Sequence, residues 1–164
     1  MQLAIISDVH DNLANLTKVL NFLKKSGLNF LVCCGDIGNL ETISYLAKNF
    51  SGQIYLAFGN VEQDFINKDE LNFPNLTVYP DFGEIELDSK KIAFCHFPQI
   101  ARQLAESSSG ELIFYGHTHQ PRQESINEKQ LINPGNVAGL LFRPTFALCQ
   151  TETEEPELKL IDLI

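Results

Sequence analysis

The segment Leu3-Ala4-Ile5-Ile6-Ser7-Asp8-Val9-His10 is a short apolar run that stops at an acid and a histidine. Such a run predicts a buried strand. Amphipathic helical spacing follows over residues 13–25, and the same pair of patterns then repeats. The later segments are apolar strands at 30–34 and 54–58 and a second helix at 40–50. Strands that alternate with helices predict βαβ units, and hence an α/β protein with a parallel sheet.

The pattern changes in the second half of the chain. Strict alternation of apolar and polar residues at 84–88 predicts a half-buried antiparallel strand. The remaining expected elements are strands at 92–95 and 112–115, a helix at 98–107, and hairpin strands at 122–126, 130–132, 146–149 and 158–161. Breaks are expected at 61–75, 108–110, 127–128 and 154–156, the first as a surface loop with room for one helical turn.

The composition is that of a globular protein. The 164 residues, 44% hydrophobic and 20% charged, suit a single domain over residues 1–164. No apolar run approaches the ~20 residues that a transmembrane helix needs, and the first residues lack the basic segment of a signal peptide. The four cysteines lie in apolar, strand-like stretches, which indicates buried thiols in a reducing compartment. These features predict a cytoplasmic protein without membrane contact.

The net charge of the chain limits which molecules it is expected to bind. A formal net charge of −9 disfavours a polynucleotide, because sequence-independent binding of nucleic acid needs a basic face. The excess of carboxylates is compatible with cation binding. Arg102, Arg122 and Arg143 could clamp a phosphate group, but they are interpreted as solvated side chains and left out of the expected site.

Each of five apolar strands is followed by side chains that can bind a metal. The set is Asp8, His10, Asp36, Asn60, His96, His117 and His119. In open α/β sheets, ligands bind at the carboxyl ends of the strands, so these seven side chains are expected to converge. They offer nitrogen and oxygen donors and no thiolate, a set that suits Mn, Fe, Ni, Co or Zn.

Seven donors are more than one catalytic ion takes from a protein. Shared between two ions, with Asp36 as the bridge, they give each ion four ligands and leave room for water or substrate. Two divalent ions about 3.5–4 Å apart stabilise both the attacking and the leaving oxygen of an in-line displacement. The sequence therefore predicts a metal-dependent hydrolase of phosphate esters. Taken singly, each histidine would be interpreted as structural, and Asp36 as a helix cap.

The chain resembles the calcineurin-like metallophosphoesterases in the order and spacing of five motifs. These are Asp8-Val9-His10, Gly35-Asp36, Gly59-Asn60, His96 after a strand, and Gly116-His117-Thr118-His119. The overall length and the stretches 7–13 and 133–136 look most like the small prokaryotic YfcE-type phosphodiesterases. The resemblance covers residues 1–140. It implies a four-layer α/β/β/α sandwich of mixed sheets and a small phosphodiester substrate, and it allows a homodimer.

The resemblance also implies a role for each donor. Two divalent ions are expected, manganese first, with nickel, iron, cobalt or zinc as alternatives. The implied ligands are Asp8, His10 and His119 for one ion, Asn60, His96 and His117 for the other, and Asp36 between them. A water or hydroxide between the ions would attack phosphorus. Asp36, Asn60 and His96 are therefore expected among the catalytic residues.

Two positions depart from the family pattern. Many relatives carry a histidine, the general acid, directly after the asparagine of the third motif, whereas this chain has Val61 followed by Glu62. Glu62 is therefore a candidate catalytic acid, beside a metal-bound water or solvent, unless only good leaving groups are cleaved fast. Phe97-Pro98 replaces the glycine that commonly follows the fourth-motif histidine, which predicts a reshaped substrate entrance.

Several alternatives stay open at the level of sequence. The chain could be a phosphomonoesterase acting on small metabolites, or a polynucleotide nuclease, although its charge disfavours the latter. It could also be a non-catalytic, Vps29-like protein-interaction scaffold, but such scaffolds have partly replaced metal positions and this chain retains every ligand type. Asn12 is open between a helix cap and a phosphate contact, and Asn136 between a turn residue and a ligand-orienting one.

Overall fold

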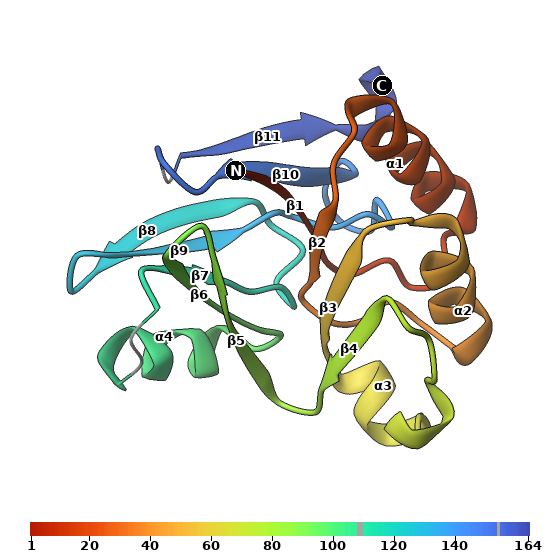
Figure 1. Cartoon of the computed structure of the whole chain (residues 1–164), viewed down its shortest axis with the longest axis horizontal. Helices are drawn as coiled ribbons and strands as arrows, with labels where there is room; N and C mark the ends of the chain where they lie inside the picture. The colour runs from red at the N-terminus through yellow and green to blue at the C-terminus, as the bar shows by residue number, and fades with distance from the viewer. Residues whose placement is uncertain (108–109, 154) are drawn as a thin grey trace.

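Two mixed β-sheets face each other in the computed structural model, which describes residues 1–107, 110–153 and 155–164 (Figure 1). The first sheet has the strand order β11-β10-β1-β2-β3-β4. Its strands are β1 (Gln2–Ile6), β2 (Phe30–Cys33), β3 (Gln53–Ala57), β4 (Leu76–Tyr79), β10 (Thr145–Gln150) and β11 (Pro156–Leu160). β1 to β4 are parallel, whereas β10 pairs antiparallel with β1 and β11. The parallel sheet predicted from the first sixty residues is confirmed.

The second sheet has the strand order β5-β6-β7-β9-β8. Its strands are β5 (Phe82–Leu87), β6 (Lys90–Cys95), β7 (Leu112–Phe114), β8 (Arg122–Ile126) and β9 (Lys129–Asn133). β5 and β6 form the antiparallel hairpin that the alternation at 84–88 predicts, and β8 and β9 form a second one. Because β6, β7 and β9 are parallel, β6 and β7 end at the same edge of the sheet.

The helices in the described part of the chain lie on the outer faces of the sheets and at one edge (Figure 1). They are α1 (Leu13–Ser26), α2 (Leu40–Asn49), α3 (Asn60–Phe65) and α4 (Pro98–Ser107), with 3₁₀ turns at Lys68–Glu70 and Ile161–Leu163. Asn12 caps α1, because its side-chain oxygen accepts the N–H of Asn15 at 3.1 Å. The cap interpretation of Asn12 is therefore confirmed.

Three apolar cores separate four layers. The first, between α1, α2 and the first sheet, contains Ala4 and Leu16. The second, between the two sheets, contains Leu3 and Phe94, and the third, under α4, contains Leu104. Neighbouring residues of β1 enter different cores because successive side chains of a strand point to opposite faces. Each large buried apolar side chain contributes about 1.5–3 kcal/mol. The α/β/β/α order implied by the family resemblance is confirmed.

Two segments differ from the sequence prediction. β4 was not expected, because its residues are only partly buried and gain their strand partner from β3, far away in the sequence. Residues 61–75 were expected as a loop with room for one helical turn, and they contain most of α3 and a 3₁₀ turn. The helix stop expected at 108–109 and the turn expected at 154 lie outside the described residues.

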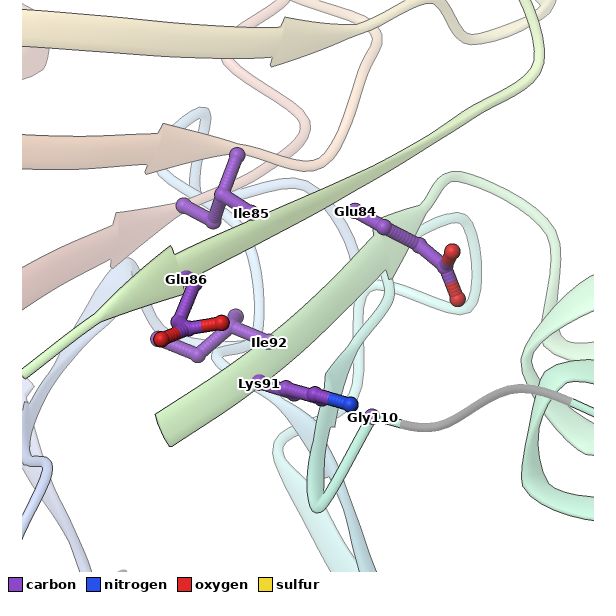
Figure 2. Close-up of a pocket in the computed structure, with 6 residues that line it drawn as sticks. All are labelled: Glu84, Ile85, Glu86, Lys91, Ile92 and Gly110. Atoms are coloured by element: carbon purple, nitrogen blue, oxygen red, sulfur yellow. The ribbon is translucent and has the colours of Figure 1, made fainter. Parts of the chain in front are cut away.

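A surface hollow lies beside the edge strand β5, away from the ends of the strands that carry the expected ligands (Figure 2). Its volume is about 240 Å³, and Glu84, Glu86 and Lys91 are among its lining residues. Lys91 is near the start of β6, whereas His96 follows the end of that strand. Exposed glutamates on an edge strand discourage pairing with another chain. Among the described residues, no helix is long and apolar enough to cross a membrane.

Candidate metal centre

All seven expected ligands follow strand ends, and both sheets supply them. Asp8 and His10 follow β1, Asp36 follows β2, and Asn60 is the first residue of α3 after β3. From the second sheet, His96 follows β6, and His117 and His119 follow β7. The sheets are stacked so that these ends meet, and the side chains gather into two adjoining groups.

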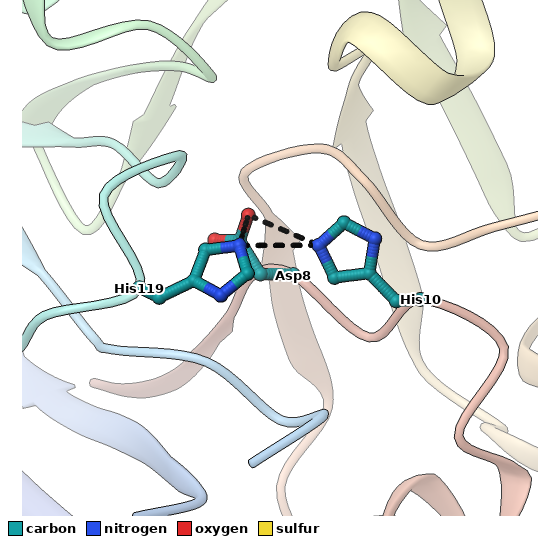
Figure 3. Close-up of side chains that lie close together, drawn as sticks. All are labelled: Asp8, His10 and His119. Atoms are coloured by element: carbon teal, nitrogen blue, oxygen red, sulfur yellow. Dashed lines mark hydrogen bonds and ion pairs between the residues drawn. The ribbon is translucent and has the colours of Figure 1, made fainter. Parts of the chain in front are cut away.

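The first group consists of Asp8, His10 and His119 (Figure 3). The two Nε2 atoms of His10 and His119 are 3.2 Å apart. Asp8 Oδ1 lies 3.3 Å from Nε2 of His119 and 3.7 Å from Nε2 of His10. Three donor atoms therefore face one point, and they come from chain segments more than one hundred residues apart.

The second group is built around His96. Its Nε2 lies 3.1 Å from Nδ1 of His117, 3.2 Å from Oδ1 of Asn60 and 3.4 Å from Oδ2 of Asp36. The same Asp36 oxygen lies 3.8 Å from Nε2 of His10 in the first group. Asp36 thus lies between the two groups.

Asp8 shows that the donor set fits a cation. Its Oδ2 accepts hydrogen bonds from the hydroxyl of Ser7 and from the backbone N–H of His117. Among the described residues, its Oδ1 is the buried side-chain oxygen that has no hydrogen-bond partner. A buried carboxylate oxygen without a partner is costly. A metal ion held together with His10 and His119 would satisfy it.

Backbone carbonyls orient the histidine rings. Nδ1 of His96 donates to the carbonyl of Cys34 at 2.7 Å, so its Nε2 is free to bind a metal. Nδ1 of His119 faces the carbonyl of Leu140 at 3.4 Å and leaves Nε2 for the first group in the same way. These contacts could not be predicted from the sequence, because they join segments that are remote along the chain.

The ligand loops contain most of the strained backbone. Five of the seven expected ligands have a positive φ: Asp8 (53°), His10 (45°), Asp36 (51°), His117 (69°) and His119 (60°). This left-handed region is uncommon for residues other than glycine. Such strain costs of order 1–3 kcal/mol per residue and persists only where the surrounding structure imposes it. The chain therefore holds these side chains in a fixed arrangement at an energetic cost.

Two motif glycines are required because other ligand loops pass close to them. A Cβ atom on Gly116 would lie 1.9 Å from the Ser7 hydroxyl and 2.9 Å from Asp8 Oδ2. A Cβ atom on Gly59 would lie 2.2 Å from Asp36 Oδ1. Contacts under 3.0 Å are not tolerated, so each glycine permits one ligand loop to pack against another.

Glu62 does not face the metal groups, which argues against the expected role of a catalytic acid. Its side chain is buried, and its Oε2 accepts the N–H groups of Asp36 at 2.9 Å and Gly59 at 2.8 Å. Its Oε1 accepts the N–H of Gly38 at 3.0 Å. Burial raises the pKa of Glu62, but both carboxyl oxygens are occupied by these three N–H donors, so neither is placed to give a proton to a leaving group. It instead ties the loop after β2 to the loop after β3.

The loop after β9 supports the double-histidine segment. Asn136 donates from Nδ2 to the carbonyl of His119 at 3.0 Å, and its Oδ1 accepts the N–H of Leu140. Asn133 donates to the carbonyl of Gly116 at 2.9 Å. Asn136 therefore orients a ligand loop through the backbone. The supporting role of Asn133 was missed, because only the turn signal of the segment 133–136 is visible in the sequence.

The charges of the site shift the pKa values of several of the expected ligands. The pKa of His96 is raised, because the hydrogen bond and charge of Asp36 outweigh the lowering effect of burial. The carboxylate of Asp8 raises the pKa of His10. Burial raises the pKa of Asp36, but His96 more than offsets this effect, so that the pKa is lowered. Burial, together with the charge of His96, lowers the pKa of His117.

The sequence model of the calcineurin-like phosphoesterase superfamily domain matches residues 1–154. The chain belongs to this family. The family assignment made from the five motifs is thus confirmed. Calcineurin-like phosphoesterases are metal-dependent, and two overlapping sets of side chains, Asp8 with His10 and His119 and Asp8 with Asp36 and His96, could hold a metal.

Two curated relatives are phosphodiesterases. Phosphodiesterase MJ0936 of Methanocaldococcus jannaschii is 28% identical over 162 residues, covering 94% of this chain and 96% of that protein. Phosphodiesterase YfcE of Escherichia coli K12 is 24% identical over 151 residues, covering 84% of this chain and 80% of that protein. The YfcE-type resemblance is therefore confirmed.

Two solved structures have the same fold as this chain. That of an archaeal phosphodiesterase matches with a TM-score of 0.86 at 26% identity, covering 98% of this chain and 99% of that one. Vacuolar protein sorting 29 of Cryptosporidium parvum matches with a TM-score of 0.70 at 19% identity, covering 97% and 95%. The second likeness shows a shared fold and nothing about activity.

Metal affinity should fall as the pH is lowered. A histidine ligand must be neutral to bind a metal, and the pKa values of His10 and His96 lie above the ordinary 6.5. Below these raised values protons compete with the metal, so each protonated ligand should weaken binding about tenfold per pH unit. Above them the affinity should level off. Calorimetric titration with Mn²⁺ from about pH 6 to pH 8 measures this dependence. A constant affinity over that range would contradict it.

The variant Glu62→Gln should weaken metal binding without touching a ligand. An amide keeps one acceptor oxygen, but its N–H₂ group then faces a backbone N–H donor. We expect the metal Kd to rise roughly 10- to 100-fold and the free energy of unfolding to fall by about 1–3 kcal/mol. The exposed Glu70 provides the matched control Glu70→Gln, with the same change of charge. Equal Kd and Tm in the two variants would show that Glu62 is not needed to hold the loops.

Proposed function

We propose that this chain is a phosphodiesterase that uses two divalent metal ions to hydrolyse small phosphodiesters. The observation that carries the proposal is Oδ1 of Asp8, which is buried, has no hydrogen-bond partner and faces Nε2 of His10 and of His119. Asp36, between the two groups, supports a second ion. The family and its phosphodiesterase relatives support the reaction class. Manganese is the expected metal, with nickel, iron, cobalt and zinc as alternatives.

The ligands would be divided as the two groups are arranged. Asp8, His10 and His119 would hold the first ion, Asn60, His96 and His117 the second, and Asp36 would serve both. When bound, such a pair of ions activates water and neutralises the charge that develops on the phosphoryl oxygens. The chain's own part is to fix the ligands in advance, through the carbonyl contacts of His96 and His119 and the strained loops. Little reorganisation then remains for the reaction itself.

The leaving group would receive little help from the protein. Val61 stands where many relatives have an acidic histidine and has no proton to donate. Glu62 is bonded to three backbone N–H groups. Solvent would therefore protonate the leaving oxygen, and the rate would depend on how stable the departing anion is.

Two other functions can be separated from this one. A phosphomonoesterase would cleave a monoester faster than a diester with the same leaving group. A scaffold would hydrolyse neither ester even when loaded with metal, and the shared fold with the Vps29 proteins keeps this alternative in view. The full set of metal-binding residue types argues against a scaffold. The cytoplasmic location and the homodimer stay predictions.

Chelator-stripped protein should hydrolyse bis(p-nitrophenyl) phosphate only after Mn²⁺ is added, and Asp36→Asn should lose this activity. The amide cannot supply the negative charge that two cations share, so we expect kcat/KM to fall at least about 100-fold. p-Nitrophenyl phosphate, with the same leaving group, gives the ratio of diester to monoester activity. A folded, metal-loaded protein that turns over neither ester would contradict the proposal and favour the scaffold.

The variant Val61→His should accelerate the hydrolysis of diesters with poor leaving groups. A histidine at this position would donate a proton to the departing oxygen, an effect worth typically 10²–10⁴-fold when the geometry is right. We expect a gain of about tenfold or more for a phenolate leaving group and little change for p-nitrophenolate. The slope of log kcat/KM against leaving-group pKa measures this, and Val61→Phe is the control for bulk. An unchanged slope would mean that the leaving group already receives a proton from the protein.

A further inference from the structure

Phe97 places an aromatic ring against the half of the site that contains His96 and His117. Its ring centroid lies 4.9 Å from that of His96 and 5.0 Å from that of His117, with interplanar angles of 79° and 61°. The ring is only partly buried. The backbone of Phe97 is held at the start of α4, because its carbonyl accepts the N–H of Ala101. An apolar ring therefore borders this half of the metal centre.

The segment 140–142 borders the other half. Its three side chains, Leu140, Leu141 and Phe142, are 48%, 89% and 41% exposed. The Leu140 carbonyl faces Nδ1 of His119 at 3.4 Å, and its N–H is bonded to Asn136, which also holds the His119 backbone. The apolar segment is thus attached to the same loop that carries a ligand of the first ion.

Leu141 is held out in solvent at an energetic cost. Its φ is +64°, and the N–H of Phe142 donates to the carbonyl of Leu140 at 2.7 Å, which closes a γ-turn around it. A positive φ is unfavourable for a bulky apolar residue. Apart from two hairpin turns at 88–89 and 127–128, the other positive values among the described non-glycine residues lie in the ligand loops, at the positions Asp8, His10, Asp11, Asp36, His117 and His119. The strained backbone of Leu141 therefore lies in a segment next to His119, and outside those two turns the ligand loops contain the other strained residues.

The arginines that could bind additional negative charge are engaged elsewhere. Arg102 and Arg122 each lie 3.0 Å from a carboxylate oxygen of Glu124, and Arg143 lies 3.4 Å from Asp162. A phosphomonoester dianion or a polyphosphate would profit from such cations. A diester carries a single charge and two ester arms, which fits a site with apolar borders.

Resting on the proposed function, we infer that Phe97 and the segment 140–142 are two apolar subsites for the ester arms of the substrate. The substrate class is then a phosphodiester monoanion with aromatic or other bulky apolar groups next to phosphorus. Phe97 would contact the arm on the His117 side and Leu141 the arm on the His119 side. Both are specificity-determining residues that select among diesters and take no part in proton transfer.

Two diesters that share p-nitrophenolate as the leaving group test this inference. They are phenyl p-nitrophenyl phosphate and methyl p-nitrophenyl phosphate, assayed with the metal-loaded protein. The phenyl group alters the reactivity of phosphorus equally in every variant, so a change in the phenyl-to-methyl ratio of kcat/KM reports contact with the arm. We expect this ratio to fall roughly 2- to 10-fold in Phe97→Leu and in Leu141→Asn.

A second measurement does not depend on turnover. Diphenylphosphinate and dimethylphosphinate have P–C bonds that are not hydrolysed, and calorimetry gives the Kd of each. The wild-type protein should bind diphenylphosphinate more tightly, and the advantage should shrink in both variants by the same factor as the kinetic ratio. If neither diester is cleaved, the proposed function fails, and the phosphinate preference alone decides for or against the apolar subsites.

Both variants, Phe97→Leu and Leu141→Asn, are expected to fold. Asparagine tolerates a positive φ, so Leu141→Asn should keep or raise Tm, and leucine at position 97 keeps apolar packing against the two imidazoles. Leu163, which is 74% exposed, provides the matched control Leu163→Asn, and its ratios should equal those of the wild type. The Mn²⁺ affinity of all variants should stay unchanged.

Unchanged ratios and phosphinate preference in both variants would overturn the inference. So would a Leu141→Asn variant that leaves the preferences intact and turns a dimer into a monomer in light scattering, since the segment 140–142 would then be an interface between copies of the chain.

Discussion

The contact between the ends of the two sheets is the constraint on which the site depends. The N–H of His117, after a strand of the second sheet, donates to Asp8 of the first at 3.1 Å, and Nδ1 of His96 donates across the same junction to the carbonyl of Cys34. Each group of donors takes members from both sheets. A metal ion bound there would connect the sheets, so metal binding and the packing of the central core should stabilise each other.

The strained backbone of the ligand loops explains why so many hydrogen bonds and packing contacts surround this junction. Five strained residues, at 1–3 kcal/mol each, amount to a cost comparable with the net stability of a whole domain. The opposing contributions are the burial of large side chains such as Phe94 and Phe114 between the sheets, and the hydrogen bonds that Glu62 and Asn136 make to loop backbone. The strained conformation of the ligand loops is therefore maintained by the core and by these hydrogen bonds, not by the local preference of the loop residues.

The sequence predicted what local patterns encode and missed what remote contacts create. The apolar runs predicted the parallel strands, and the polar residues that end these runs predicted the seven donors. This works because the carboxyl ends of the strands meet at one edge, whatever the details of packing. β4 was missed because its strand character comes from pairing with β3. The position of Glu62 could not be seen, since its partners Asp36 and Gly38 lie more than twenty residues away. The left-handed backbone of His117 and the ring orientation of His96 likewise depend on the assembled sheets.

The apolar residues around the centre have a common physical consequence. Val61 removes a proton donor, Phe97 covers one side of His117, and Leu141 is held beside the loop of His119 at a cost in strain. With a net charge of −9 and its arginines paired, the chain offers little beyond the metal ions to offset a second negative charge on a substrate. A diester monoanion has no second negative charge to be compensated. Its two arms can contact both apolar borders, whereas the single arm of a monoester can contact only one. The apolar residues thus favour a substrate with bulky arms. The binding energy of these arms can lower the barrier of a reaction that receives no proton from the protein.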